Sequence, residues 1–458
     1  MVGFQLHDGP NSGRRRRNRD HQLQLPDRRF VSNDERHSSL RALRHRDFAL
    51  FWTAAAISNG GGWMQMVAVP ALLYDMTGSS TWLGVSSMAG LLPAVFLTPY
   101  AGVLADRVSR RSILLITQTV QMLCAFSLWG FYLSDSIRPG LIVSIGLIGG
   151  IATGFQTAAW QSFVPLLVPK EELLDAVKLN SVQFTLARAI GPGLAGAVVT
   201  TLGTGAAILI NAVTYLLVIG ALFISNPRQS IVPSAGAKVS EVLRDGGRFV
   251  WRSRPLRIAV FLAFVTSLCG QALQHVAPAI ANRIYDRPST DNAGLLVALG
   301  LGALASSVIS VAIGDKLKRS TRVMVALVLF AGSTALIPLT SNYNIGLVAY
   351  FIGGLAHLQS AVALNTLIQG TVPDHLRGRT MSFYVLGILA GIPLGAFALG
   401  RLGDIFTMRV AVYADAVVFV LLIALLIGRG WLADLNVSKI DDVTSTSPAA
   451  EPIASDPL

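Results

Sequence analysis

Long apolar runs separated by short polar turns make up most of this chain of 458 residues. A helix needs about 20 predominantly apolar residues to cross a bilayer, and twelve runs reach that length. They fall at 48–74, 82–105, 112–133, 140–165, 179–202, 205–225, 256–282, 293–314, 321–341, 345–370, 380–402 and 408–432. This pattern predicts an all-α integral membrane protein with twelve transmembrane helices.

The longest internal polar stretch separates the runs into two sets of six and predicts two bundles. We expect the chain to divide into a basic disordered arm, a six-helix bundle, a linker, a second bundle and a disordered tail, at 1–47, 48–226, 227–255, 256–433 and 434–458. Within the linker, apolar positions recur at helical spacing, at Val239, Val242, Leu243, Gly246, Phe249 and Val250. They predict an amphipathic helix lying on the membrane surface.

Composition agrees with a membrane protein, since 52% of residues are hydrophobic, 14% are charged and the mean hydropathy is +0.56. The net charge of +12 does not indicate nucleic-acid binding, because no folded soluble domain is predicted to carry it. Cys124 and Cys269 both lie inside apolar runs, so neither a disulfide framework nor a metal site is expected. We expect no cofactor.

Basic residues predict the orientation. With the N-terminus inside, the turns on the inner side hold eighteen Lys and Arg and those on the outer side hold five, while the arm adds eleven Arg inside. The positive-inside rule therefore predicts that both termini are cytoplasmic.

One charged turn interrupts the apolar pattern between the second and third runs. Residues 102–111 read GVLADRVSRR. This pattern resembles the signature loop of the major facilitator superfamily, the twelve-span secondary transporters built from two pseudo-symmetric six-helix bundles. The resemblance implies that Gly102, Asp106, Arg107 and Arg111 form a conformational latch at the cytoplasmic face and do not bind substrate. The alternative is a positively charged turn with no further role.

An internal repeat supports two related bundles. Three pairs of residues lie 204 positions apart, namely Pro169 and Pro373, Gly191 and Gly395, and Gly196 and Gly400. The spacing of the charged turn also recurs at Gly400, Leu402 and Asp404, followed by Arg409, on the predicted opposite face. It is either a trace of an inverted repeat or a chance match, and no role is assigned to it.

The fifth run contains the segment 187–196, which reads ARAIGPGLAG. Gly191 followed by Pro192 opens the backbone hydrogen-bond ladder and permits a close, kinked helix contact. Arg188, Gly191, Pro192 and Gly196 of this segment resemble a Gly-Pro motif of drug and proton antiporters. This chain departs from the motif at one position, where Ala195 stands in place of a glycine. Together with Val164-Pro165, Val168-Pro169 and Asn180, the segment also resembles the exporter branch that includes the bacterial enterobactin exporter, and this resemblance implies a bacterial inner membrane. Small-residue packing is the alternative explanation.

Among the Lys and Arg residues of the sequence, Arg188 is the one that the pattern places deep within a span. A charge there costs roughly 2.5 to 3.5 kcal/mol on insertion scales and needs a compensating interaction. One candidate is an anionic or carbonyl-rich substrate in a central cavity. The other is a local partner such as Gln183, Gln156 or a helix-end carbonyl.

Polar side chains cluster in the first, fourth, seventh and tenth runs, which line the transport pathway in the family that the chain resembles. The candidates for the substrate cavity are Asn59, Gln65, Gln156, Trp160, Gln161, Gln271, Gln274 and Asn365. Any of them could instead form hydrogen bonds between helices.

The acidic residues within or beside the runs all fall near predicted ends, at Asp75, Asp106, Asp315, Asp404 and Asp415. His275 and His357 lie deeper and titrate near neutral pH, so they are the candidates for proton coupling. Structural hydrogen bonding is the alternative role for both.

These features favour a secondary transporter that exports small organic molecules, such as drugs, secondary metabolites or siderophores, by alternating access and proton antiport. An importer with the same fold is the alternative. A scaffold or receptor would need a docking domain, and an enzyme would need a nucleophile, metal or nucleotide motif that the sequence lacks. We expect a monomer in the bilayer, with a proton as counter-ion.

Overall fold

The computed structural model describes residues 41–227, 239–313 and 316–437, and these ranges contain helices and no strand. The first half consists of α1 (Arg46–Thr77), α2 (Ser80–Arg107), α3 (Arg110–Leu133), α4 (Pro139–Phe163) and α5 (Leu173–Ile224). The second half consists of α7 (Arg254–Val265), α8 (Ala277–Arg283), α9 (Asn292–Ile313), α10 (Arg319–Leu339), α11 (Tyr343–Thr371), α12 (Asp374–Ile405), α13 (Met408–Gly428) and α14 (Trp431–Asp434). Helix α6 (Val239–Arg252) joins the two halves. Most of the predicted arm and tail lie outside the described residues.

Two of these elements need a closer description to follow the path of the chain. Helix α5 contains Gly203 at φ 85° and ψ 166°, a conformation open to glycine, which divides it into two crossings. Helix α7 continues through a π-helical segment, η4 (Thr266–Gln271), and a 3₁₀ turn, η5 (Ala272–Gln274), toward α8. Ten helical stretches within the described ranges are long and apolar enough to span a membrane; Lys170–Ile224 counts once among them, and α1 is not included. The path is consistent with twelve crossings.

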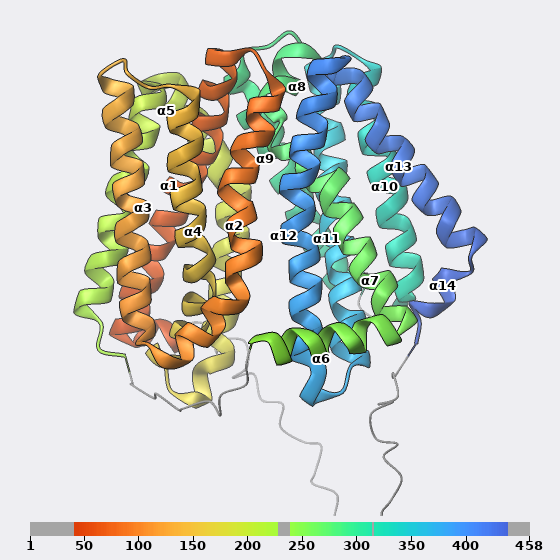
Figure 1. Cartoon of the computed structure of the whole chain (residues 1–458), viewed down its shortest axis with the longest axis horizontal. Coiled ribbons are helices and arrows are strands. Elements are labelled where there is room, and N and C mark those ends of the chain that lie inside the picture. The colour runs from red at the N-terminus through yellow and green to blue at the C-terminus, as the bar shows by residue number, and fades with distance from the viewer. Residues whose placement is uncertain (1–40, 228–238, 314–315, 438–458) are drawn as a thin grey trace, which may run out of the picture. The chain divides into compact units, whose positions relative to one another are not determined.

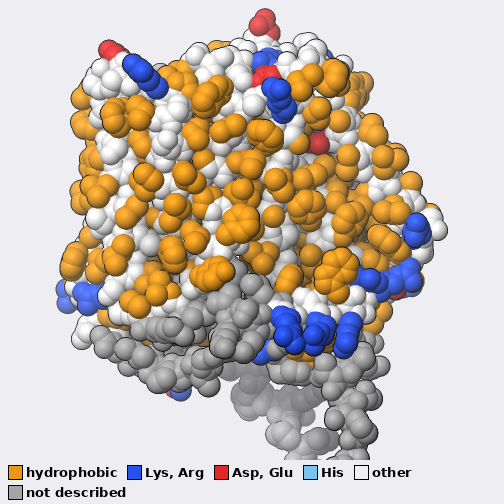
Figure 2. Space-filling view, viewed as in Figure 1, with side chains coloured by type: hydrophobic (Ala, Val, Ile, Leu, Met, Phe, Trp, Pro, Cys, Tyr) orange, Lys and Arg blue, Asp and Glu red, His pale blue; other side chains and the backbone are white. Residues whose placement is uncertain are grey.

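The two halves stand side by side, and α6 runs across the helix ends of the second half (Figure 1). We call the end that carries α6 the linker face, and the end that carries the α1–α2 connection and α8 the distal face. On the face shown in Figure 2, hydrophobic side chains cover the middle of the molecule, and Lys and Arg gather toward its two ends. Apolar side chains such as Val311, at 84%, and Val308, at 70%, are exposed, as is common in a chain surrounded by lipid. The prediction of an all-α membrane fold is confirmed.

The two halves meet through glycines on two pairs of helices. A Cβ on Gly84 of α2 would lie 2.5 Å from the Phe397 Cα of α12, and one on Gly400 of α12 would lie 2.2 Å from the Ser80 carbonyl oxygen of α2. On the second pair, a Cβ on Gly300 of α9 would lie 2.7 Å from the Arg188 carbonyl oxygen of α5. These glycines let the backbones of the two halves touch, and the α2–α12 contact lies toward the distal face.

Candidate functional site

One polar contact joins the two halves at the centre of the membrane layer. Arg188 lies midway along the first crossing of α5, and His357 lies midway along α11. The Arg188 Nη1 and His357 Nε2 atoms are 3.4 Å apart. Because a guanidinium can only donate, this geometry assigns the acceptor role to Nε2 of a neutral imidazole.

The structure gives Arg188 a partner other than the local ones that the sequence suggested. Both amide atoms of Gln183 are buried without a partner among the described residues, so Gln183 does not bind the guanidinium. Gln156 accepts a hydrogen bond from Gln121 instead. The partner that the structure gives Arg188 is therefore a histidine of the opposite half, which the sequence alone did not pair with it.

A small polar cavity lies beside His357 in the second half. Its volume is about 10 Å³, close to the space that one water molecule needs. Gln271, Ser267 and Ser360 share its lining with His357, and the Gln271 Nε2 donates to the Ser267 Oγ at 2.7 Å. Since this lining comes from the π-helical segment of α7 and from α11, the irregular stretch of the seventh span faces the central histidine.

In the first half, two of the predicted cavity residues form hydrogen bonds between helices. The Gln65 Oε1 on α1 accepts from the Asn211 Nδ2 on α5 at 2.6 Å. Gln156 on α4 and Gln121 on α3 are hydrogen-bonded, and Gln121 also accepts from the Tyr215 hydroxyl at 2.8 Å. These amides already have partners within one half, and their contact with substrate stays a prediction.

The remaining predicted cavity residues of the first half differ in exposure. Trp160 is 7% exposed and packs against Phe51 with ring centroids 4.8 Å apart. Asn59 carries a buried Nδ2 that has no partner among the described residues, whereas Gln161 is exposed. Of the three, Asn59 and Trp160 each carry a buried donor, the Nδ2 and the Nε1, that has no partner among the described residues.

In the second half, the other predicted residues form local contacts. The Gln274 Nε2 and His275 Nε2 are 3.5 Å apart on neighbouring positions of the chain. The Asn365 Oδ1 accepts from the Gln369 Nε2 one turn further along α11 at 2.5 Å. His275 therefore has a local neighbour, while His357 has a partner across the two halves.

The antiporter-like segment of α5 contacts both halves. A Cβ on Gly191 would lie 2.6 Å from the Trp63 Cγ of α1, and one on Gly196 would lie 2.7 Å from the Ala293 Cβ of α9. Pro192 between them is buried inside α5. The small residues of this segment thus let α5 pack against α1 and α9 close to Arg188.

The predicted latch is described only in part. The Arg111 Nη2 donates to the Phe223 carbonyl oxygen at 2.8 Å, near the linker-face end of α5. Gly102 is exposed on α2, and a Cβ there would meet nothing within 4 Å. The side chains of Asp106 and Arg107 lie outside the described residues, so the latch stays a prediction.

On the distal face, a cluster of polar side chains connects the two halves. These residues had no role in the sequence-based prediction. The Asp404 carboxylate at the end of α12 accepts from the backbone N–H groups of Ser80 and Thr81 at 2.9 and 2.8 Å, and from the Ser79 hydroxyl at 2.5 Å. These N–H groups belong to the first turn of α2, whose positive dipole end favours a carboxylate. Asp404 of one half therefore caps a helix of the other.

Arg283 completes this cluster. Its Nη1 lies 2.9 Å from the Asp404 Oδ1, and its other nitrogens donate to the Tyr74 hydroxyl at 3.0 Å and to the Gly78 carbonyl oxygen at 2.6 Å. The Tyr74 hydroxyl in turn donates to the Asn282 Oδ1 at 3.1 Å. We call Tyr74, Asn282, Arg283, Asp404 and the first turn of α2 the distal clamp. The recurrence of the signature spacing at Gly400, Leu402 and Asp404 was its signal in the sequence.

Asp415 lies deeper than its position near a predicted span end suggested. It sits two turns inside α13, is 8% exposed, and carries an Oδ2 that has no hydrogen-bond partner within the described ranges. A titratable neighbour of its carboxylate is the Cys269 thiol on the π-helical segment. A buried carboxylate in this environment is a second candidate proton site beside His357.

A sequence profile described as transmembrane secretion effector matches residues 37–456. The chain belongs to this family of the major facilitator superfamily. It is therefore a multi-pass membrane transporter and not an enzyme.

Curated relatives agree with this family over most of their length. The multidrug efflux pump Tap of Mycolicibacterium fortuitum is 25% identical over 77% of this chain and 88% of its own. The enterobactin exporter EntS of Salmonella choleraesuis is 25% identical over 74% of this chain and 82% of its own. The staphyloferrin A transporter of Staphylococcus aureus is 20% identical over 78% and 89%.

Solved structures share the fold at low identity. A point mutant of the nucleoside transporter NupG superposes with a TM-score of 0.72 at 10% identity and covers 83% of this chain and 99% of its own. A bacterial homologue of the lysosomal transporter Spinster, in an inward-facing and unoccupied conformation, gives 0.67 at 12% identity, covering 86% and 98%. At this identity the likeness concerns the fold alone.

Proposed function

We propose that this protein exports a small organic compound that carries an anionic or carbonyl-rich group, in exchange for protons. The observation that carries the proposal is the Arg188–His357 contact, because it joins the two halves at mid-membrane with a permanent cation and a titratable base. The named activities of the Tap and EntS relatives support export, of drugs in one case and of a siderophore in the other.

The conformation fits the loading state of an exporter. The distal clamp and the glycine contacts of α2 with α12 hold the halves together toward the distal face. The positive-inside rule assigns the linker face, with the basic helix α6, to the cytoplasm. A substrate would therefore enter from the cytoplasmic side and meet Arg188 at the end of that path.

The proton would act on the same contact. A neutral His357 accepts from Arg188, whereas a protonated imidazole loses its acceptor and places a second positive charge 3.4 Å from the guanidinium. Proton binding thus separates the two side chains and, with them, one connection between the halves. Either a proton on His357 or an anion on Arg188 would break the contact, so each ligand by itself would release this connection between the halves, which is one requirement of exchange.

The test measures accumulation in cells of ethidium, a rhodamine dye, a catecholate chelator and a citrate-based chelator, with and without a protonophore. Cells with the wild-type protein should accumulate less of at least one of the two chelators, and the protonophore should abolish the difference. Arg188→Gln should abolish it as well. Lower accumulation of the cationic ethidium alone would contradict the proposed substrate class. Higher accumulation in wild-type cells would instead indicate import.

Coupling is tested on the exported compound with the purified protein in liposomes. His357→Gln should lose transport driven by a pH gradient but keep substrate exchange at equal pH. The matched control is His275→Gln, which removes a membrane histidine for which the described residues supply only a local neighbour. If Asp415→Asn, and not His357→Gln, uncouples transport, the proton site lies on α13. If both histidine variants behave alike, the Arg188–His357 mechanism is wrong.

A further inference from the structure

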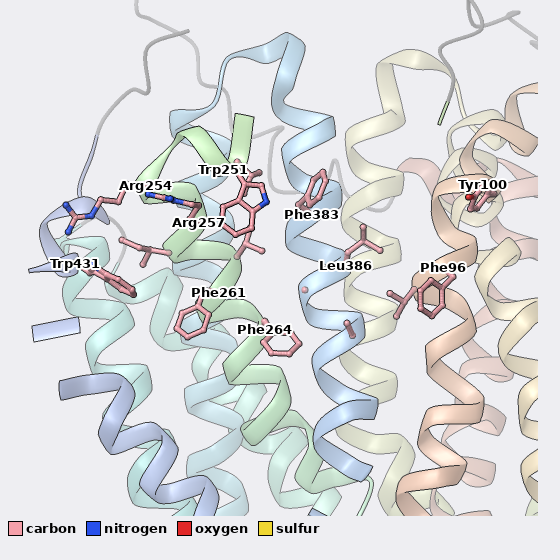
Figure 3. A pocket seen from close by; sticks show the side chains of 16 residues that line it. Phe96, Tyr100, Trp251, Arg254, Arg257, Phe261, Phe264, Phe383, Leu386 and Trp431 are labelled. Atoms are coloured by element: carbon pink, nitrogen blue, oxygen red, sulfur yellow. The ribbon is translucent and has the colours of Figure 1, made fainter. Parts of the chain in front are cut away.

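A second, larger cavity opens between the two halves toward the linker face. Its volume is about 930 Å³, and α2 forms one wall while α7 and α12 form the other. Phe96 on α2 and Leu386, Phe383, Phe261 and Phe264 on the opposite wall line it (Figure 3). We call it the lateral cavity.

The lateral cavity opens to the lipid-facing side of the molecule. Phe96 is 65% exposed and Phe261 is 41% exposed, although both line it. Filling such an apolar hollow with water is unfavourable, and its volume falls in the range of pockets that hold a whole organic ligand. The surrounding bilayer offers apolar chains to fill it.

The charges of the lining lie at one end. Arg254 and Arg257, at the start of α7, are the charged side chains of the lining. The Arg254 guanidinium already has two polar partners. Its Nε lies 3.1 Å from the Asp434 Oδ2, and its Nη2 donates to the Arg429 carbonyl oxygen at 3.2 Å. The exposed guanidinium of Arg257 has no hydrogen bond or ion pair within the part of the chain that the structure describes. One cation therefore stands unpaired, among these described residues, at the mouth of an apolar cavity.

Neighbouring side chains place this mouth at the level of lipid headgroups. Three further Arg side chains on α6, at positions 244, 248 and 252, are exposed, and a row of basic side chains borders the apolar surface there (Figure 2). Trp251 and Trp431 line the same end of the cavity, and Trp and Arg both favour the membrane–water interface. From Arg257 to Phe264 the helix rises by roughly 10 Å, so the cavity extends from this level into the apolar layer.

We infer that the lateral cavity binds an anionic phospholipid of the leaflet at the linker face. Its phosphate contacts Arg257, and an acyl chain lies against Phe96, Phe261 and Phe264. The apolar depth requires a chain, and the unpaired guanidinium requires an anion, so charge complementarity selects this class of lipid over zwitterionic lipids. The inference does not depend on the transported compound or on the proton.

The position of the lipid has a conformational consequence. The walls of the lateral cavity belong to both halves, so its width depends on how far α2 stands from α7 and α12 at the linker face. A conformation that closes the linker face would expel the lipid. The bound lipid therefore stabilises the conformation described here, in which the distal face is closed.

The experiment uses the delipidated full chain in detergent, titrated with phosphatidylglycerol or with phosphatidylcholine of the same acyl chains, and counts bound lipids by native mass spectrometry. The wild type should bind phosphatidylglycerol about tenfold more tightly, as expected for one charge-assisted contact. Arg257→Gln should remove this preference and Arg257→Lys should keep it. The matched control Arg248→Gln, on α6 outside the lining, should also keep it.

A second variant tests the apolar part. Leu386→Trp places a larger side chain in the cavity and should weaken the binding of both lipids, provided that the variant elutes as a single species. Equal losses in Arg257→Gln and Arg248→Gln would overturn the inference in favour of diffuse surface charge. Displacement of phosphatidylglycerol by an exported dye, with the same dependence on Arg257, would make the cavity a substrate entrance and would also overturn it.

Discussion

Asp404→Asn should shift the conformational equilibrium toward the state that is open at the distal face. The substitution keeps the shape of the side chain but removes the charge that Arg283 and the first turn of α2 both contact. The ion pair is mostly buried, with side chains 29% and 18% exposed. A hydrogen bond to a charged group contributes about 1.5–3 kcal/mol and a neutral one about 1 kcal/mol, so the loss over the cluster is about 2–3 kcal/mol.

This loss corresponds to a change of roughly 30- to 140-fold in the ratio of the two conformations, since every 1.4 kcal/mol is a factor of about ten. If the wild type favours distal closure by about 100 to 1, the variant should populate both states in comparable amounts. Such a change is large enough to appear as a second distance population and not merely as a broader one.

Electron–electron double resonance with spin labels can measure this shift. In a background without Cys124 and Cys269, labels are attached at Leu133 on α3 and Val410 on α13, which are 67% and 49% exposed at distal-face ends of different halves. The matched control is Asp75→Asn, which removes an exposed carboxylate from the same face. The reasoning fails if Asp404→Asn leaves the distance distribution unchanged, or if the control shifts it equally.

Three further predictions concern packing and hydrogen bonds. Gly84→Ala should widen the distal face in the same distance measurement and lower the unfolding temperature, because its Cβ would lie 2.5 Å from the Phe397 Cα; overpacking of this kind costs about 1–3 kcal/mol. Gly90→Ala, where a Cβ meets nothing within 4 Å, should do neither. Tyr74→Phe removes the hydroxyl between Arg283 and Asn282 and should shift the distal equilibrium by only about 1 kcal/mol; a shift as large as that of Asp404→Asn would show that the hydroxyl matters as much as the charge. Gln65→Leu should lower the unfolding temperature, since leaving the buried partner amide unpaired costs about 1–3 kcal/mol; an unchanged unfolding temperature with a raised KM would instead support its predicted substrate contact.

Most of the fold could be predicted from the sequence. Spans of about 20 apolar residues and the charged turn at 102–111 were sufficient to predict an all-α membrane fold. In lipid, the backbone N–H and C=O groups of each crossing must form hydrogen bonds within that crossing, and short turns leave few ways to connect consecutive helices. The same local logic predicted the helix at 239–252, whose apolar positions recur at helical spacing.

The sequence also singled out Arg188 and His357, but as separate residues. Their types were informative by themselves, since a charge or a titratable group inside lipid requires a reason. Their pairing was not predictable, because the two positions lie on helices of different halves, and only the relative placement of these halves brings Nη1 and Nε2 to 3.4 Å. The hydrogen bond between Gln65 and Asn211 was not predictable either, because it depends on how two distant crossings of the first half pack against each other.

The distal clamp illustrates which features follow from the sequence and which depend on the tertiary structure. The sequence by itself determined that Asp404 repeats the spacing of the signature turn. It also determined that the chain crosses the membrane as helices, and that turns rich in Lys and Arg alternate with turns that contain few of them. Only the tertiary structure decided that this carboxylate caps α2 of the other half and that Arg257 stands at the mouth of an apolar cavity. The physical reason is that span formation depends on local hydrophobicity and backbone hydrogen bonds, whereas the contacts between halves depend on the angle and depth at which complete helices pack.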